Sequence, residues 1–152
     1  MIVLLRRATA EDAPRVAGLL IDTRSAFMPY AVSAHSEAEV REWVATQLIP
    51  TGGVTVAARR DGVIAVMATE RSATCSWITQ MAVDPLLVGR GVGAMLLAHA
   101  MRTLALPIRL YTFQANVGAR RFYERHGFVA VEHTDGRGNE ERQPDVRYEW
   151  KG

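Results

Sequence analysis

The stretch from Gln80 to Met101 constrains the fold more than any other part of this 152-residue sequence. It begins as an apolar strand, breaks at Asp84-Pro85, passes through Gly89-Arg-Gly-Val-Gly93 and continues with apolar residues at helical spacing. Alternate glycines let a backbone approach a ligand closely, and the first turn of the following helix carries free N–H groups that favour an anion. The stretch therefore predicts a phosphate-binding loop; the alternative is a tight turn that only leads into a packed helix.

Two common phosphate-binding loops do not fit this stretch. The P-loop needs a lysine that reaches the phosphates, and the only lysine in the sequence is Lys151. The dinucleotide fingerprint fails as well, because Leu96 stands where its third glycine belongs when the count starts at Gly91. The next strand runs into Gln114 and offers no acidic residue for a ribose. The loop is thus expected to hold another phosphate-containing ligand.

The composition is that of an ordinary globular protein, with 49% hydrophobic and 22% charged residues. We expect one domain spanning residues 1–152, long enough to bury a substantial core. A formal charge of +2 is too small to indicate nucleic-acid binding, and no apolar run of roughly 18 residues indicates a membrane span. The single cysteine, Cys75, excludes an intramolecular disulfide and fits a reducing compartment. With no secretory signal at the N-terminus, we expect a cytoplasmic protein.

Periodicity and turn signals predict an α/β domain with a mixed sheet. Thr9 and Ser36 each begin a capping-box pattern and therefore a helix, and Asp61-Gly62 marks a hairpin between two strands. Strands are expected at 2–8, 55–60, 63–69, 75–83, 108–113, 128–132 and 146–150, and helices at 9–23, 36–47, 92–101 and 116–126.

Two segments together resemble the GNAT-type N-acetyltransferases, a family that uses acetyl-coenzyme A. The first is Met81-Ala-Val-Asp-Pro85 followed by Val88-Gly-Arg-Gly-Val-Gly-Ala94, which is similar to the family's pyrophosphate motif Q/R-x-x-G-x-G/A. Val88 departs from the Q/R position, at little cost because this loop binds mainly through backbone N–H groups. The second segment is Asn116 to Phe128, which is similar to the family's following helix and strand.

The resemblance implies a single-domain GNAT-like α/β fold. Its mixed, largely antiparallel sheet of about seven strands would carry a V-shaped splay and about four flanking helices. The backbone before the loop would bind the pantetheine arm and the loop amides the pyrophosphate, with no metal. The cofactor-binding residues that the resemblance implies are Met81, Ala82, Val83, Val88, Gly89, Arg90, Gly91, Val92, Gly93, Ala94, Asn116, Ala119, Phe122 and Tyr123.

The implied activity is direct transfer of an acetyl group from the thioester to an amine of a small molecule or peptide. Tyr123 matches the family's tyrosine that protonates the departing thiolate, a role that suits a phenol with a pKa of about 10; the alternative is packing beside Phe122. The group that removes the proton from the attacking amine is less defined. Glu70, which ends the strand next to the loop strand, is the nearest acidic candidate, and a water relay is an equal alternative. His35, Glu141 and Asp145 are further candidates, each compatible with a surface or turn position.

The apolar segment 27–30 is expected to be a loop, and it is equally compatible with a buried core and with a wall of the acceptor site. The acceptor site is expected to be lined by Phe27, Tyr30 and Trp77. Acidic residues of the 139–145 hairpin would favour a cationic amine. A rival reading is a non-catalytic acyl-coenzyme A-binding or sensing module, and another is a nucleotide-binding protein that uses the same loop. We expect no nucleic-acid or membrane partner, and the resemblance allows a homodimer.

Overall fold

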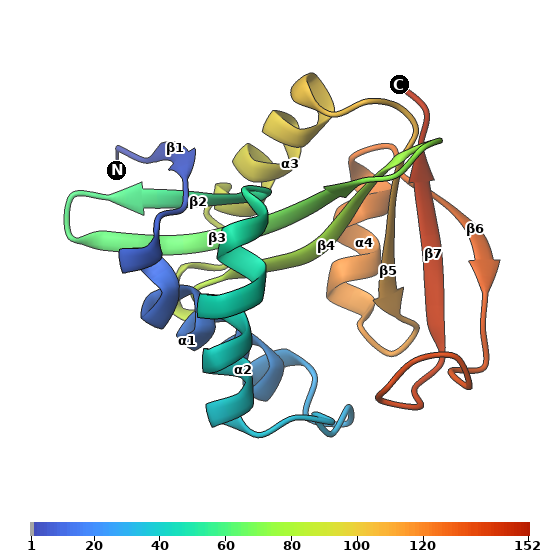
Figure 1. Cartoon of the computed structure of the whole chain (residues 1–152). Helices are drawn as coiled ribbons and strands as arrows, with labels where there is room; N and C mark the ends of the chain where they lie inside the picture. The colour runs from blue at the N-terminus through green and yellow to red at the C-terminus, as the bar shows by residue number, and fades with distance from the viewer. Residues whose placement is uncertain (1) are drawn as a thin grey trace.

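The computed structural model of the protein describes residues 2–152 and contains one seven-stranded sheet (Figure 1). The strand order is β1-β2-β3-β4-β5-β7-β6, and every neighbouring pair is antiparallel except β4 and β5. The predicted mixed, largely antiparallel sheet is therefore confirmed. The strands are β1 Leu4–Arg7, β2 Val54–Arg59, β3 Gly62–Arg71, β4 Ser76–Val83, β5 Ile108–Phe113, β6 Val129–His133 and β7 Asp145–Trp150; the helices are α1 Ala13–Phe27, α2 Glu37–Trp43, α3 Val92–Thr103 and α4 Val117–Arg125.

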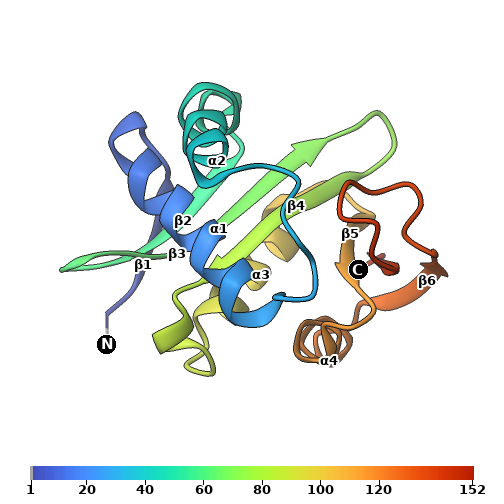
Figure 2. The same cartoon turned by 90° about the horizontal axis from the view of Figure 1, so that it is seen from below.

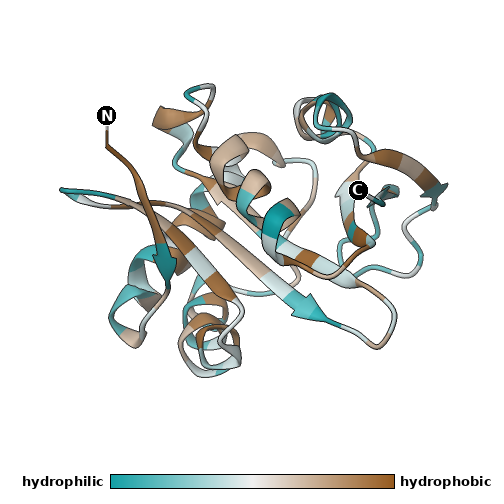
Figure 3. Ribbon diagram, turned by 90° about the horizontal axis from the view of Figure 1, so that it is seen from above, coloured by the Kyte–Doolittle hydropathy of each residue, from teal (hydrophilic) through white to brown (hydrophobic). Residues whose placement is uncertain are grey.

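The helices cover the sheet on both faces. Figure 1 shows α1 and α2 below the central strands and α3 above them, and Figure 2 looks onto the face that α1 and α2 cover. One core cluster joins α1 and the segment after α2 to β2 and β3, through residues such as Leu19, Val44 and Val66. A second cluster joins α3 and α4 to the opposite face, through residues such as Leu96 and Tyr123. The hydrophobic colouring concentrates on the central strands, whereas exposed strand ends and turns are hydrophilic (Figure 3).

Two helices differ from their predicted extents. Helix α1 continues to Phe27, whereas the sequence predicts an end near residue 23. It continues because Arg24 to Ala26 still favour a helix. It ends only where Pro29 restricts the backbone of Met28, so Phe27 lies on the helix and not in a loop. The second helix is α-helical only to Trp43 and continues as a π-helical turn over Val44–Leu48.

The sheet opens between β4 and β5, as the resemblance implied. The two parallel strands pair only at Ser76 with Ile108 and Trp77 with Arg109, and then diverge (Figure 1). Beyond that point β5 stays paired with β7 as far as Phe113, so the divergence is not caused by the end of a strand. A bulge between Ala68 and Thr69 interrupts the β3–β4 ladder, and bulges increase local twist. The result is a V-shaped gap in the sheet.

Hydrogen bonds to the carboxylate of Asp12 connect the start of α1 to β1. The carboxylate accepts hydrogen bonds from the two terminal nitrogens of Arg6 at 2.7 and 3.0 Å and from the backbone N–H of Thr9 at 2.8 Å. The hydrogen bonds from Arg6 are the main reason that the pKa of Asp12 lies below its usual value, and burial opposes them. This capping box holds the first helix in place.

Replacing Asp12 with Asn is expected to lower the free energy of unfolding by about 1 kcal/mol, because the cap and the ion pair with Arg6 both weaken. The lowered pKa means that the carboxylate stabilises the fold above its unfolded value of 3.8, and that this contribution is lost as the pH falls through the folded pKa. Urea unfolding near neutral pH and well below pH 3.8 measures the difference. The exposed neighbour Glu11, changed to Gln, is the control. A wild-type advantage that persists unchanged in acid contradicts the prediction.

Candidate active site

The loop between β4 and α3 lies at the surface with its backbone donors free. Gly89 and Gly91 have φ angles of +82° and +83°, which glycine adopts without strain. The first hydrogen bond of α3 runs from Met95 N–H to the Gly91 carbonyl at 3.0 Å, and no side chain caps this helix. The N–H groups of residues 88–94 have no hydrogen-bond acceptor anywhere in residues 2–152. Free donors at a helix N-terminus form a binding site for an anion.

Gly93 connects this loop to the rest of the site. A Cβ at Gly93 would lie 3.5 Å from the Phe122 ring and 3.6 Å from the Val83 side chain. The start of α3 therefore sits close to both the end of β4 and α4. Val92 next to it is buried in the core, whereas Val88 and Arg90 are exposed.

The divergence of β4 and β5 leaves a cleft of about 590 Å³. One wall is β4 from Ile78 to Met81, and the other is β5 from Leu110 to Phe113. Helix α4 lies across one end, and its residues that line the cleft are Asn116, Ala119 and Tyr123. The Oδ1 of Asn116 accepts a hydrogen bond from Ala119 N–H at 3.2 Å, so the predicted N-cap of this helix is present.

The backbone of β4 presents unpaired groups to this cleft. Asp84 donates its N–H to the Ile64 carbonyl of β3 at 2.8 Å. Backbone groups alternate in direction along a strand, so those of Met81 and Val83 point away from β3 and toward the gap. Since β5 pairs with β4 only as far as Trp77, no strand satisfies them there; the Val83 carbonyl accepts a hydrogen bond from the Thr23 hydroxyl at 3.4 Å. Such an edge is a template for an extended ligand.

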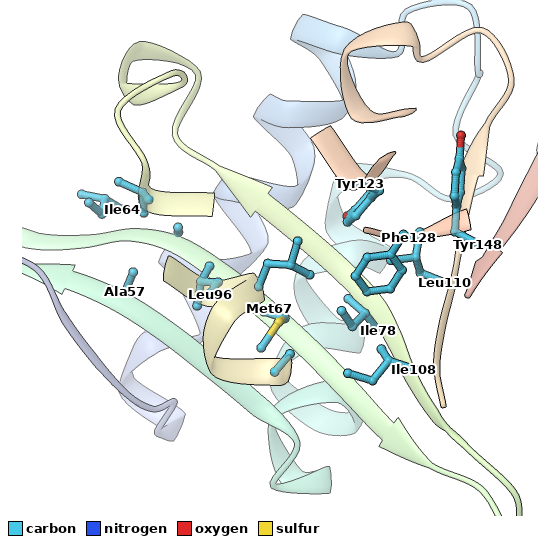
Figure 4. Close-up of a cluster of buried hydrophobic side chains, with 14 of the residues drawn as sticks. Ala57, Ile64, Met67, Ile78, Leu96, Ile108, Leu110, Tyr123, Phe128 and Tyr148 are labelled. Carbon is cyan, nitrogen blue, oxygen red and sulfur yellow. The ribbon is translucent and has the colours of Figure 1, made fainter. Parts of the chain in front are cut away.

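Tyr123 lies at the inner end of the cleft. Its side chain is 7% exposed, and its ring packs edge-on against Phe122 with centroids 5.1 Å apart. It also packs edge-on against Phe128 with centroids 5.8 Å apart (Figure 4). No group in the described chain hydrogen-bonds its hydroxyl. Burial raises the pKa of Tyr123 above its ordinary value. The phenol therefore stays protonated and keeps its proton available to a ligand in the cleft.

A polar network behind Tyr123 fixes α4 against β7. The Tyr148 hydroxyl donates to Glu124 at 2.5 Å and accepts from Nε of Arg120 at 3.1 Å. Because Glu124 follows Tyr123 in the helix, this network holds the catalytic candidate in place. Arg120 is thereby engaged in the fold, whereas Arg121 is exposed. No local pattern indicates this network, apart from the alternating apolar residues of the last strand.

A second cavity of about 860 Å³ adjoins the cleft on the side of α1 and α2. It is bounded by the last turns of α1, by α2, by β4 from Gln80 to Ala82 and by Glu140 and Glu141. The two cavities share lining residues from α1, β4 and the β6–β7 connection: Arg24, Met28, Gln80, Met81 and Glu141. A ligand in the cleft and a ligand in the second cavity would therefore meet beside Gln80 and Met81.

Four of the side chains predicted for catalysis or acceptor binding line neither cavity. Glu70 is exposed opposite Trp77, at the end of the hairpin away from Met81. Trp77 stacks on Tyr111 with ring centroids 5.6 Å apart. Tyr30 packs edge-on against Phe113 at 6.1 Å, and its hydroxyl is buried without a partner; Phe27 is 42% exposed.

Within the predicted segment 27–30, Met28 lines both cavities. Asp145 lines the cleft but is held in the fold by hydrogen bonds from the Thr134 hydroxyl and from Asn139 Nδ2, the latter at 3.1 Å. It therefore anchors the β6–β7 connection. His35 and Glu141 both face the second cavity.

Residues 50–130 match the model of the acetyltransferase (GNAT) domain. The chain belongs to the GNAT acetyltransferase family. The matched segment contains β4, the glycine loop, α3 and α4, which are the elements that build the site. A search of the curated proteins finds no match. Within residues 2–152, no group of three or more His, Cys, Asp and Glu side chains is arranged to hold a metal ion, and no helix has the length and apolar character of a membrane span.

Several solved structures share the fold over essentially the whole chain. The apo form of YjaB from Escherichia coli superposes with a TM-score of 0.79 at 22% identity and covers 100% of this chain and 99% of its own. PaiA N-acetyltransferase from Thermoplasma acidophilum, in complex with coenzyme A, has a TM-score of 0.78 at 18% identity and covers 100% of both chains. A GNAT acetyltransferase from Bacillus cereus has a TM-score of 0.78 at 14% identity, covering 99% of this chain and 98% of its own.

Proposed function

We propose that this GNAT protein is an N-acetyltransferase that transfers the acetyl group of acetyl-coenzyme A directly to an amine of a small molecule or peptide. The observation that carries the proposal is the continuity of the site. A surface loop of free backbone donors leads past Gly93 to a cleft containing a protonated tyrosine, and a second cavity adjoins that cleft. A phosphate-bearing thioester and an amine can thus enter from different sides.

In this proposal the backbone N–H groups of residues 88–94 bind the pyrophosphate, and Arg90 adds positive charge beside them. The backbone groups of Met81 and the N–H of Val83, which no strand pairs, hydrogen-bond the pantetheine arm as a short additional strand. Asn116, Ala119 and Phe122 complete the wall on the side of α4. The loop fits this ligand because its donors have no partner within the described chain.

The chemistry requires a neutral amine, a donor for the carbonyl oxygen and a proton for the departing thiolate. A carbon–nitrogen bond forms and the carbon–sulfur bond breaks. The N–H of Met81 or Val83 stabilises the charge that develops on the oxygen, and Tyr123 gives its proton to the sulfur. The amine proton leaves through water in the second cavity, since Glu70 lies outside both cavities. A returning proton restores Tyr123.

A thiol-release assay with acetyl-coenzyme A and a panel of amines tests the proposal, combined with calorimetric titrations of acetyl-coenzyme A, ATP and NAD. We expect acetyl-coenzyme A to bind most tightly and at least one amine to release thiol above the hydrolysis background. Tight coenzyme binding without transfer to any amine would favour the acyl-coenzyme A sensor. Preferential binding of either nucleotide would favour the nucleotide-binding alternative.

A further inference from the structure

The second cavity has an excess of negative charge. Six carboxylates line it, and the cationic side chains that face it are Arg24 and, when protonated, His35. The carboxylates are contributed by both helices and by the β6–β7 connection: Asp22, Glu37, Glu39, Glu42, Glu140 and Glu141. A cavity walled by one sign of charge concentrates ligands of the opposite sign. Since the cavity adjoins the proposed thioester site, its negative charge acts on the amine acceptor that enters there.

The negative charge is not spread evenly over the cavity. Where the cavity meets the cleft, Glu141 is paired with Arg24 at 3.2 Å, so the wall nearest the reacting atoms is close to neutral. Farther out, Glu39 and Glu140 converge on the His35 ring at 3.8 and 3.0 Å. These two carboxylates come from different elements and lie within reach of one cationic group. The carboxylates without an arginine partner thus lie away from the junction.

This distribution matters because the reacting amine must lose a proton before it attacks. An unpaired carboxylate beside that nitrogen would favour the ammonium form and oppose the attack. A second positive group at the far end of the acceptor is attracted by the carboxylates of the second cavity. Because it is not the reacting nitrogen, its protonation does not oppose the attack. The Arg24–Glu141 ion pair at the junction, and the carboxylates beyond it that contact His35, suit an acceptor with one neutral and one protonated nitrogen.

We propose that the acceptor is an aliphatic amine with a second, protonated amino group several carbon atoms from the reacting nitrogen, held by Glu39 and Glu140. The inference rests on the proposed acetyl transfer and specifies its substrate class. Three probes differ only at the distal end: 1,4-diaminobutane is positive there, 1-aminobutane is neutral and 4-aminobutanoate is negative. We expect kcat/KM to be about tenfold higher for the diamine than for 1-aminobutane, and lowest for the acid.

The double variant Glu39→Gln/Glu140→Gln removes both distal charges while keeping side-chain size. Gln at residue 39 still accepts the capping hydrogen bond that the Ser36 N–H makes at 3.0 Å, so α2 keeps its N-cap. We expect the preference for the diamine to fall at least about threefold in this variant. Glu132→Gln, an exposed change on β6 outside both cavities, is the control and should retain the preference. Far-ultraviolet circular dichroism confirms that the variants are folded.

The outcomes separate this inference from the proposed function. Equal acetylation of the diamine and 1-aminobutane, or a preference that survives the double substitution, overturns the inference and leaves acetyl transfer standing. Failure to acetylate any amine although acetyl-coenzyme A binds overturns the proposed function and the inference with it. A diamine preference that weakens in the double variant and with added salt supports both.

Discussion

Replacing Tyr123 with Phe is expected to lower kcat about 100-fold, because the departing thiolate loses its proton donor. The Kd of acetyl-coenzyme A should stay nearly unchanged, since the ring and its packing against Phe122 and Phe128 are kept. The fold should not suffer either, because the hydroxyl makes no hydrogen bond within residues 2–152. Burial raises the pKa of Tyr123 above 10.0, so the wild-type phenol remains protonated at alkaline pH and its ionisation should not limit the rate there.

Steady-state kinetics and calorimetry on the same preparations measure these effects. Tyr111→Phe is the matched control, because it removes a hydroxyl from the opposite wall of the same cleft, where the side chain is 50% exposed. We expect that variant to keep a rate close to that of the wild type. If Tyr123→Phe retains full activity, the proton-donor role is wrong and Tyr123 only packs the core.

Replacing Gly91 with Val is expected to raise the Kd of acetyl-coenzyme A at least about tenfold. Gly91 has a φ of +83°, which a β-branched residue adopts only with strain, and no heavy atom lies within 4 Å of the position of its Cβ. The substitution therefore acts on the backbone and not through a clash. It should turn the N–H groups at the start of α3 away from the orientation that the pyrophosphate needs.

Gly52→Val separates lost binding from general strain. Gly52 has nearly the same φ, +79°, and the nearest atom to its Cβ position is the end of the Arg7 side chain at 4.0 Å, but it lies before β2 and lines neither cavity. Both variants should lose about 1–3 kcal/mol of unfolding free energy from backbone strain. Only the substitution in the loop should weaken binding of the coenzyme. A comparable loss of affinity in the two variants would show that the loop has no special role.

Much of the fold follows from local signals in the sequence. The Asp61-Gly62 turn, the capping boxes and the apolar periodicity place the strands and helices correctly, with shifts of a few residues at their ends. The insertion of β7 between β5 and β6 is not visible locally, because strand order depends on long-range pairing. The length of α1 was underestimated because Pro29, and not the residues near 23, ends it.

Local patterns likewise predict part of the site, whereas another part depends on long-range packing. Glycines with positive φ and a helix start leave a strong local signature, so the loop around Gly91 was predictable with its neighbours. Met28 and Arg24 reach the junction of the two cavities only because α1 crosses the sheet near β4, and no local pattern indicates that crossing. The position of Glu70 on a neighbouring strand predicts a base near the cleft, but the strand runs past the cleft and leaves that side chain exposed.

Backbone amide chemical shifts during a coenzyme A titration test most directly whether residues 88–94 bind the diphosphate beside the cleft. At 152 residues the protein suits two-dimensional nitrogen–proton spectra. Coenzyme A should shift the amides of residues 88–94 together with those of Met81 and Val83, whereas pantetheine, which lacks phosphates, should shift only the β4 amides. If the amides of residues 88–94 keep their positions while others move with saturating coenzyme A, the ligand binds elsewhere and the proposed site is wrong.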